Sequence, residues 1–300
     1  MDTQTSWSSR TSVVVITRDR RSELLGSLAR LLALPERPRV IVVDNDSSDG
    51  TADAVAELYP ALDVVRLDRN LGAAARTVGV RRARTPYVAF SDDDSWWAAG
   101  ALERAADTLD RIPSLAVLAA RILVGPDERL DPVCRSMRNS LLGELPGAGP
   151  RVLGFVACGA VVRRSAYLQV GGFHPRYGVG GEELLLTLDL IERGWACAYV
   201  EGVVAHHHPS PVRDTRARRV REVRNDMWTL WLRRPLRRVL PETTWVLARL
   251  PVDREARAGF REALAGAPWV LRERTPITPP TERALRRLRS VGEVGATKSS

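Results

Sequence analysis

The chain has 300 residues, enough for one large α/β domain with an appendage or for two small domains. Its hydrophobic content of 44% and charged content of 27% are ordinary for a globular protein and exclude general disorder. A net charge of +9 favours anionic partners such as nucleotides, phosphates or an acidic membrane surface, although solubility and a basic tail explain it equally well.

The first hundred residues alternate short apolar runs with segments of helical spacing. The apolar runs predict buried strands at residues 12–16, 40–43, 64–67 and 87–90. The helical segments lie between them, at residues 20–34, 51–59 and 73–82. This alternation predicts a Rossmann-like α/β fold, in which a mostly parallel sheet carries helices on both faces. Ligands of such sheets bind beyond the carboxyl ends of the strands.

The pattern is less regular after residue 95. We expect helices at 102–110 and 182–193, strands at 115–124 and 195–204, and a Gly- and Pro-rich loop over the site at 125–150. From residue 213 the chain becomes Arg-rich and helical. We therefore predict an α/β domain at 11–212, a basic helical extension at 213–290, and disordered ends at 1–10 and 291–300.

The three cysteines, Cys134, Cys158 and Cys197, are widely spaced and odd in number. This spacing argues against a disulfide framework and a zinc site, and it favours a reducing setting. The first residues lack the apolar core of a signal peptide, and no stretch reaches the ~20 apolar residues of a membrane span. We expect a cytoplasmic protein whose only membrane contact would be peripheral, at the inner face.

Three adjacent carboxylates, Asp92, Asp93 and Asp94, directly follow the fourth predicted strand. They repel one another unless they are solvated or neutralised by a cation. Mg²⁺ and Mn²⁺ take such oxygen ligands and bridge them to phosphate groups. Alternate residues of an extended segment point the same way, so Asp92 and Asp94 can converge on one ion. A solvated acidic turn explains these three residues, taken alone, at least as well.

Two further segments place polar residues at the end of a predicted strand or at the start of a predicted helix. Asp44 ends the second strand, where its carboxylate can accept a hydrogen bond from a nucleobase. The turn-forming residues that follow it need no ligand to explain them. Small residues at 72–75 let a ligand approach a helix start whose amides favour anions, and Arg76 can then pair with a diphosphate. A tightly packed helix with a surface Arg is the alternative.

These strings together resemble the nucleotide-sugar glycosyltransferases of family 2, whose fold is called GT-A. Val14–Arg20 is similar to that family's strand followed by Thr-Tyr-Asn-Arg, and Val42–Thr51 is similar to its Val-Asp-Asn-x-Ser-x-Asp-Gly-Thr. Asn70–Arg76 is similar to its Asn-x-Gly-x-x-x-Ala-Arg, and Asp92–Asp94 falls where the family has Asp-x-Asp. Four matches in order over residues 12–95 are far more specific than any one of them, and a weaker match continues to about residue 210.

The resemblance implies roles for these residues. Thr17 and Asp44 would line the nucleoside pocket, and Arg76 would lie near the base or the diphosphate. Asp92 and Asp93 would contact the nucleotide, while Asp92 and Asp94 would hold Mn²⁺ or Mg²⁺. The chain departs from the family pattern at Arg18, Asp19 and Thr77, which replace Tyr, Asn and Asn and affect details of the donor site.

The segment from Gly171 to Glu183 resembles the family's acceptor-side segment, which ends in Glu-Asp with the final acid as general base. The resemblance therefore implies Glu183 as the catalytic base and Glu182 as its reserve. Glu183 replaces the expected Asp, and Leu185 stands where an acid is common. From the residues alone, a flexible glycine run can deliver a carboxylate to an acceptor hydroxyl. Acids that complement a helix N-terminus explain the same pair.

Three of the four histidines are consecutive, at His206, His207 and His208. If the preceding strand continues, His206 and His208 face one way and His207 faces the other. Imidazole is a suitable ligand for Mn²⁺. Because related enzymes place a metal-ligating His after this strand, the resemblance implies His206 or His208 as a third ligand. A substrate contact or a solvated strand end remains open.

Aromatic residues follow the acidic triplet and recur in the basic extension. Trp96 and Trp97 are candidates for stacking on an acceptor sugar, with packing against a helix as the alternative. The segment 213–224 is Arg-rich, and one or two of its arginines are candidates for holding the leaving diphosphate. The apolar residues at 228–232 next to two arginines fit either an interfacial amphipathic segment or a core-packing helix.

We predict a metal-dependent, hexosyltransferase-like enzyme that moves a sugar from a nucleotide-diphosphate sugar to an acceptor hydroxyl with inversion. By resemblance, the acceptor is a carbohydrate, a lipid-linked molecule or a small molecule, and the pathway is polysaccharide, cell-wall or glycolipid synthesis. A catalytically inactive relative that only binds partners is one alternative. A nucleotidyltransferase is another, but 17–21 lacks the glycine-rich loop of such enzymes. We expect no nucleic-acid partner, because no coherent basic motif is present.

Overall fold

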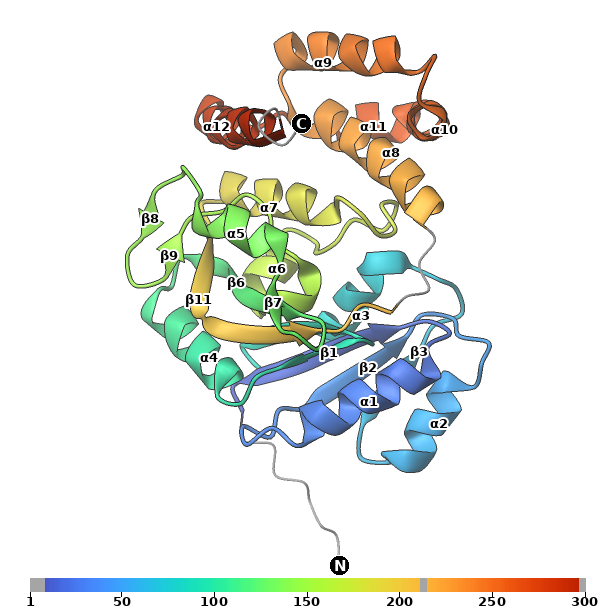
Figure 1. Ribbon diagram of the computed structural model, residues 1–300, viewed down its shortest axis with the longest axis vertical. Helices are drawn as coiled ribbons and strands as arrows, with labels where there is room; N and C mark the ends of the chain where they lie inside the picture. The colour runs from blue at the N-terminus through green and yellow to red at the C-terminus, as the bar shows by residue number, and fades with distance from the viewer. Residues whose placement is uncertain (1–8, 211–214, 297–300) are drawn as a thin grey trace, which may run out of the picture.

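A computed structural model of the chain describes residues 9–210 and 215–296 (Figure 1). Its main feature is a nine-stranded sheet with the strand order β3-β2-β1-β4-β10-β6-β11-β5, and β7 pairs with β6 beside this path. The strands are β1 (Thr11–Thr17), β2 (Val40–Asp44), β3 (Asp63–Arg66), β4 (Tyr87–Asp92), β5 (Ser95–Trp97), β6 (Leu115–Val124), β7 (Arg129–Leu130), β10 (Ala160–Arg163) and β11 (Ala196–His207). A separate hairpin joins β8 (Glu144–Leu145) and β9 (Gly149–Pro150).

The first four strands run parallel and end at the same edge of the sheet. β1 pairs in parallel with β2 and β4, and β2 pairs in parallel with β3. The register sets Thr17 opposite Asp44 and Ile16 opposite Asp92, so the polar strand ends are neighbours. β6 and β11 are also parallel, while β10 runs antiparallel between β4 and β6. The predicted α/β fold with a mostly parallel sheet is therefore confirmed.

Helices cover both faces of the sheet because alternate strand residues point to opposite sides. On one face, Val13 and Val15 pack against the leucines of α1 (Arg21–Leu32) and the apolar side of α4 (Ala101–Arg111). On the other face, Val14 packs against α3. The remaining helices of this part are α2 (Thr51–Leu58), α3 (Ala75–Arg82), α5 (Pro132–Arg138), α6 (Arg164–Gln169) and α7 (Glu182–Glu192).

Five helices follow the sheet and stack on its α7 side (Figure 1). They are α8 (Thr215–Arg233), α9 (Leu236–Arg249), α10 (Arg254–Ala265), α11 (Ala267–Glu273) and α12 (Pro279–Ala296). One apolar cluster joins Tyr177 and Leu185 to residues of α8, α10 and α11. A second joins Leu188 of α7 to Leu285 of α12. The helices therefore share buried surface with the sheet domain.

The predicted domain limits can be compared with the described residues only in part. The described ranges leave out residues 1–8, 211–214 and 297–300. Arg213, the predicted start of the extension, is therefore not among the described residues. Arg10, predicted to lie in a disordered end, pairs with Asp107 and Asp110 of α4. α12 extends to Ala296, beyond the predicted limit at residue 290. Within the described ranges, no helix is both long and apolar enough to cross a bilayer.

Candidate active site

The acidic triplet lies at the carboxyl end of β4, next to the ends of β1 and β2. Asp93 and Asp94 are buried, and Asp92 is about one-third exposed. The Thr17 hydroxyl donates to Asp93 Oδ2 at 3.3 Å. The Ser27 hydroxyl of α1 donates to the backbone oxygen of Asp93 at 2.8 Å. The structure thus brings Thr17 to the acidic triplet. Both lie at the carboxyl edge of the sheet, where the sequence analysis expects ligands to bind.

Two arginines oppose the negative charge of the triplet. Arg76, only 4% exposed, forms an ion pair with Asp92. Arg20 lies 3.6 Å from an Asp93 oxygen and 3.7 Å from an Asp94 oxygen. Even so, burial, reinforced by the neighbouring charges of Asp92 and Asp94, raises the pKa of Asp93 to about 7. A site in which a carboxylate resists ionisation is one that a further cation would stabilise.

The three histidines divide between the two faces of β11, as the alternation predicts. His207 points to the triplet, with its Nε2 3.3 Å from Asp94 Oδ1. His206 and His208 point the other way, onto the ring of Trp96. The reason is the register of β11 against β5, which pairs His206 with Trp96 and His207 with Ser95. The structure therefore does not bring the predicted ligands His206 and His208 to the carboxylates; it brings His207 there instead.

The predicted nucleoside side of the site contains Asp44 and its neighbour Asn45. Asp44 is buried, and its Oδ1 accepts a hydrogen bond from the backbone amide of Ser47 at 3.0 Å. Asn45 bridges to the next loop: its Oδ1 accepts from Leu71 N at 2.7 Å, and its Nδ2 donates to Gly72 O at 3.1 Å. Sequence reasoning missed Asn45, although its place directly after a buried strand was a usable signal.

A backbone contact joins the loop after Leu71 to the glycine-rich loop before α7. Ala73 N donates to Gly178 O at 2.8 Å. Gly72 has φ +58°, and a Cβ there would lie 2.5 Å from the Cα of Gly178. Glycine is therefore required at position 72 by both the conformation and the close approach.

The two acids predicted as catalytic lie at the first turn of α7. Glu182 is buried, and its carboxylate accepts a hydrogen bond from Gly180 N. Glu183 is partly buried, and burial and the adjacent Glu182 raise its pKa to about 8. The charges of Arg76 and Asp92 act on both carboxylates, so this helix end lies near the Arg76–Asp92 pair. Glu183 therefore has the raised pKa of a group that can accept a proton near neutral pH.

The loop that leads into α7 is held by Asn225 of α8, which sequence reasoning also missed. Asn225 is fully buried, and its Nδ2 donates to Tyr177 O and to Gly180 O. Sequence alone gave no signal, because the contact joins residues 45 positions apart. A helix of the basic extension thus positions the loop before Glu182 and Glu183.

The two tryptophans have different surroundings. Trp97 is 1% exposed and belongs to the core beneath α1 and α4. It does not reach an acceptor, so for Trp97 the core-packing alternative describes the structure. Trp96 is partly buried: its ring stacks on His206 with centroids 5.4 Å apart, and the Arg30 guanidinium lies 3.7 Å from its centroid. Trp96 lies with His206 and His208 on the α1 side of the sheet, away from the triplet, so the structure brings neither predicted tryptophan to the acidic residues.

The decisive observation comes from comparison with known protein families. Residues 12–171 match the sequence profile of Glycosyl transferase family 2, which is more than half of the chain. The chain belongs to this family. It is a glycosyltransferase that takes its sugar from a nucleotide sugar, so the nucleotidyltransferase alternative is discarded. The matched residues include the acidic triplet, whereas Glu182 and Glu183 lie beyond them.

Individual relatives cover different parts of this glycosyltransferase. N-acetylglucosaminyl-diphospho-decaprenol L-rhamnosyltransferase of Mycobacterium tuberculosis is 29% identical over 231 residues, 65% of this chain and 75% of that protein. Pre-mycofactocin glycosyltransferase of the same organism is 33% identical over 221 residues, 69% of this chain but only 45% of that protein. The solved mannosyltransferase PcManGT from Pyrobaculum calidifontis, in complex with GDP-Man and Mn²⁺, has a TM-score of 0.58 at 20% identity. The match covers 98% of this chain and 89% of that one. This likeness shows the GT-A fold.

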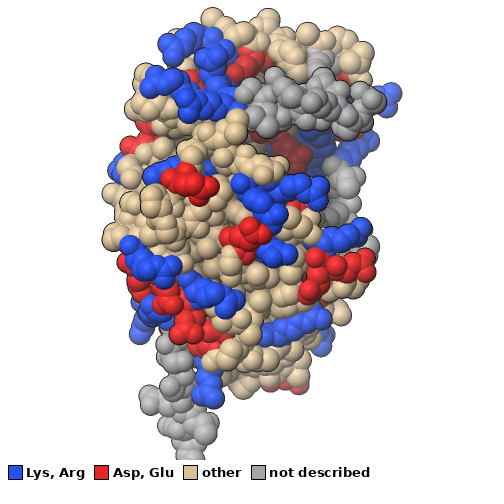
Figure 2. Space-filling view, turned by 60° about the vertical axis from the view of Figure 1, so that its left-hand side comes forward, with Lys and Arg blue, Asp and Glu red and all other residues tan. Residues whose placement is uncertain are grey.

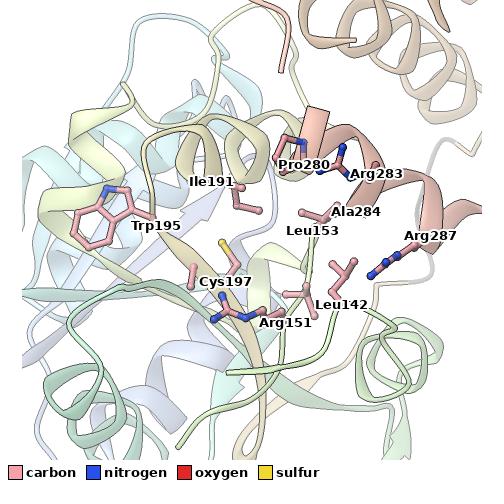
Figure 3. A pocket seen from close by; sticks show the side chains of 12 residues that line it. Leu142, Arg151, Leu153, Ile191, Trp195, Cys197, Pro280, Arg283, Ala284 and Arg287 are labelled. Atoms are coloured by element: carbon pink, nitrogen blue, oxygen red, sulfur yellow. The ribbon is translucent and has the colours of Figure 1, made fainter. Parts of the chain in front are cut away.

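A cavity of about 270 Å³ lies at the start of β11, whereas His207 at the end of that strand meets the triplet. Figure 3 shows its lining, with Trp195 and Cys197 on one side and Arg283 and Arg287 of α12 on the other. Leu142 also lines it, so the second half of the Gly- and Pro-rich segment lies here rather than over the site. The cavity belongs to the seam between α12 and the sheet domain.

Proposed function

We propose that the protein is a metal-dependent, inverting glycosyltransferase in which Glu183 is the general base. The observation that carries the proposal is the position of Glu183, at the start of α7 and within electrostatic reach of the Arg76–Asp92 pair. A donor diphosphate at the triplet and a carboxylate with a raised pKa facing it are the two parts that direct displacement at a sugar carbon requires.

The metal, Mn²⁺ or Mg²⁺, would be held by Asp92 and Asp94, with His207 as the ligand in place of His206 and His208. The donor set fits, since carboxylate oxygens suit both ions and imidazole suits Mn²⁺. Among the described residues no group of three or more His, Cys, Asp or Glu is already arranged to hold an ion. Diphosphate oxygens of the donor would complete the coordination. When bound, the metal would supply charge neutralisation for the departing diphosphate.

The chain's own residues would act as follows. Glu183 removes the proton of the acceptor hydroxyl as that oxygen attacks C1 of the donor sugar. The bond from C1 to the diphosphate oxygen breaks on the opposite face, so the configuration inverts. The electron pair leaves with the nucleoside diphosphate, whose charge Arg76 helps to stabilise. Asp44 and Thr17 hold the nucleoside at the ends of β2 and β1.

We infer the acceptor class from the relatives. One relative's name specifies a sugar-diphosphate-polyprenol acceptor, and another acts on a small molecule, pre-mycofactocin. We propose a lipid-linked saccharide as the acceptor, in cell-wall polysaccharide or glycolipid synthesis. The longer of the two alignments supports this choice, because it spans 75% of the rhamnosyltransferase.

A thermal-shift screen tests the donor site. Nucleoside diphosphates of the five common bases are added with and without Mn²⁺ or Mg²⁺ to the wild type, Asp94→Ala and the control Glu103→Ala, an exposed acid of α4. One nucleotide should raise Tm of the wild type and the control in a metal-dependent way, and Asp94→Ala should lose this shift. No shift at millimolar nucleotide would refute the proposal. Nucleotide binding without sugar transfer to any lipid-linked acceptor would favour the inactive-relative alternative.

A further inference from the structure

A groove of about 860 Å³ opens between three of the C-terminal helices, α8, α9 and α12. Asp226, Leu230 and Arg234 line it from α8, and their spacing of four residues places them on one face of that helix. At a rise of about 1.5 Å per residue, these three positions span roughly 12 Å of the helix. The groove therefore runs along α8, with residues of α9 and α12 as its other walls.

One end of the groove lies beside the loop before the candidate base. Asp226 lines the groove, and a Cβ built at Gly181 would lie 3.6 Å from its Oδ1. Gly181 directly precedes Glu182 and Glu183. A ligand at the Asp226 end therefore lies next to the backbone that carries both acids.

The walls of the groove are cationic. Five arginines and two acids line it, which gives a net charge of +3. Arg234 is buried and paired with Glu242 and Glu282. Arg283 and Arg286, by contrast, are exposed side chains of α12 that form no ion pair within residues 9–210 and 215–296. Because they are three residues apart, they lie on one side of α12 and can share an anion.

The end of the molecule that holds the groove also carries the excess positive charge of the chain. Residues 215–296 contain 19 Arg and 9 Asp or Glu, a net charge of +10, whereas residues 1–210 contain 24 Arg and 26 Asp or Glu, a net charge of −2. Figure 2 shows Lys and Arg side chains gathered at this end. The C-terminal helices therefore attract anions without the help of a metal ion.

The groove also has an apolar part. Met227 and Leu230 of α8 are buried, and Val246 of α9 is partly buried. The ring of Trp245, which is 58% exposed, lines the groove beside them. Such side chains gain from contact with hydrocarbon and offer nothing to a free phosphate ion. The ligand that fits both parts carries an anionic group and a hydrocarbon chain on the same molecule.

We propose that the groove binds the lipid diphosphate of the acceptor. Arg283 and Arg286 hold the diphosphate oxygens, since a guanidinium pairs with phosphate through two parallel hydrogen bonds. Trp245 and Leu230 pack against the first carbons of the lipid chain. The saccharide lies at the Asp226 end, beside the loop before α7. A nucleic acid would match the arginines but leave the apolar part without a partner, and a neutral lipid would leave the arginines without one.

The inference rests on the lipid-linked acceptor proposed above, but the binding step needs neither donor nor metal. Calorimetric titration of the full-length protein with farnesyl diphosphate, a short isoprenoid diphosphate, tests it in the presence of EDTA. The groove variants are Arg283→Gln/Arg286→Gln and Trp245→Ala. Their matched controls are Arg84→Gln/Arg129→Gln, exposed arginines of the sheet domain, and Leu58→Ala, an exposed leucine of α2. Asp94→Ala reports whether the ligand occupies the donor site instead.

The wild type, both controls and Asp94→Ala should bind farnesyl diphosphate with the same Kd. Each groove variant should raise that Kd about tenfold. Inorganic diphosphate and farnesol, which each lack one part of the ligand, should bind the wild type at least about tenfold more weakly. Arg283 also lines the smaller cavity at the start of β11, whereas Trp245 lines only the groove of the two, so the Trp245→Ala result places the ligand.

Absence of wild-type binding, or a Kd that neither groove variant changes, would overturn the proposal. So would a loss of binding in Asp94→Ala, an unchanged Kd in Trp245→Ala, or inorganic diphosphate that binds as tightly as farnesyl diphosphate. Flotation with phosphatidylglycerol vesicles in place of farnesyl diphosphate binding would assign the groove to bilayer headgroups and also overturn it. None of these results touches the metal-dependent nucleotide shift, so failure of the groove and failure of the proposed sugar transfer are distinguished.

Discussion

The raised pKa of Glu183 makes a prediction about stability that needs no substrate. In the folded chain its pKa is about 8, against an ordinary value of 4.5. The folded state therefore holds this proton more tightly than the unfolded state. The sign follows: the stabilisation is fully present below pH 4.5 and is lost as the pH rises through 8. Glutamine cannot ionise, so Glu183→Gln escapes this loss.

The size of the effect follows from the shift. A pKa difference of about 3.5 corresponds to roughly 5 kcal/mol for a fully buried group, and partial exposure of Glu183 lowers the expected value to roughly 2–4 kcal/mol. Glu183→Gln should therefore equal the wild type at pH 5 and exceed its Tm at pH 9 by roughly 5–10 °C. The assay is thermal unfolding at pH steps between these limits, with the exposed Glu57→Gln as control.

The same group governs activity in the opposite direction. As the base, Glu183 works only when ionised, so kcat/KM should rise tenfold per pH unit up to about pH 8. Glu183→Gln should lower kcat by roughly 10²–10⁴-fold while leaving nucleotide affinity near the wild-type value. A Tm difference between Glu183→Gln and wild type that does not change with pH would refute the reasoning, because desolvation would then not hold the proton.

Three further substitutions test the contacts around the site. Gly72→Ala should cost roughly 1–3 kcal/mol of stability in urea unfolding and weaken nucleotide binding, whereas Gly26→Ala, with open space at its Cβ, should be neutral or stabilising. Asn225→Ala should cost roughly 1–3 kcal/mol and lower kcat, because the buried Gly180 carbonyl loses its donor and the Tyr177 carbonyl keeps only Arg224; the exposed Asn139→Ala is the control, and equal effects would contradict the assignment. Trp96→Ala should leave the acceptor KM and the donor Kd near their wild-type values, because its ring packs against His206 and Arg30 away from the triplet; a rise of about tenfold in the acceptor KM would instead place Trp96 in the acceptor site.

The sheet was predictable because its strands are nearly uninterrupted runs of β-branched and apolar residues. β1, β2 and β4 lie within a residue or two of their predicted bounds, and their carboxyl ends carry the predicted polar residues. The acidic triplet was also visible in the sequence, because it directly follows a strand, whereas the pairing of Arg76 with Asp92 was not predicted. Such local signals need no knowledge of distant contacts.

The parts that sequence did not provide depend on pairing between distant segments. Which histidine meets Asp94 is decided by the register of β11 on β5, and a shift of one residue would reverse the answer. The apolar residues at 228–232 were compatible with an interfacial helix or a core helix. In the structure Trp228 and Leu232 are buried, and the exposed apolar surface lies on α9 instead. An amphipathic pattern shows that a face is apolar but not what covers it.

The apolar cluster that joins Tyr177 and Leu185 to α8, α10 and α11 bears on how this protein can change during evolution. These two residues flank the stretch that contains Gly178 and both catalytic candidates, and their side chains are buried among the C-terminal helices. The helices are therefore not an interchangeable module. An exchange of these helices between relatives will also change the packing of the loop that carries Gly178 and the two acids.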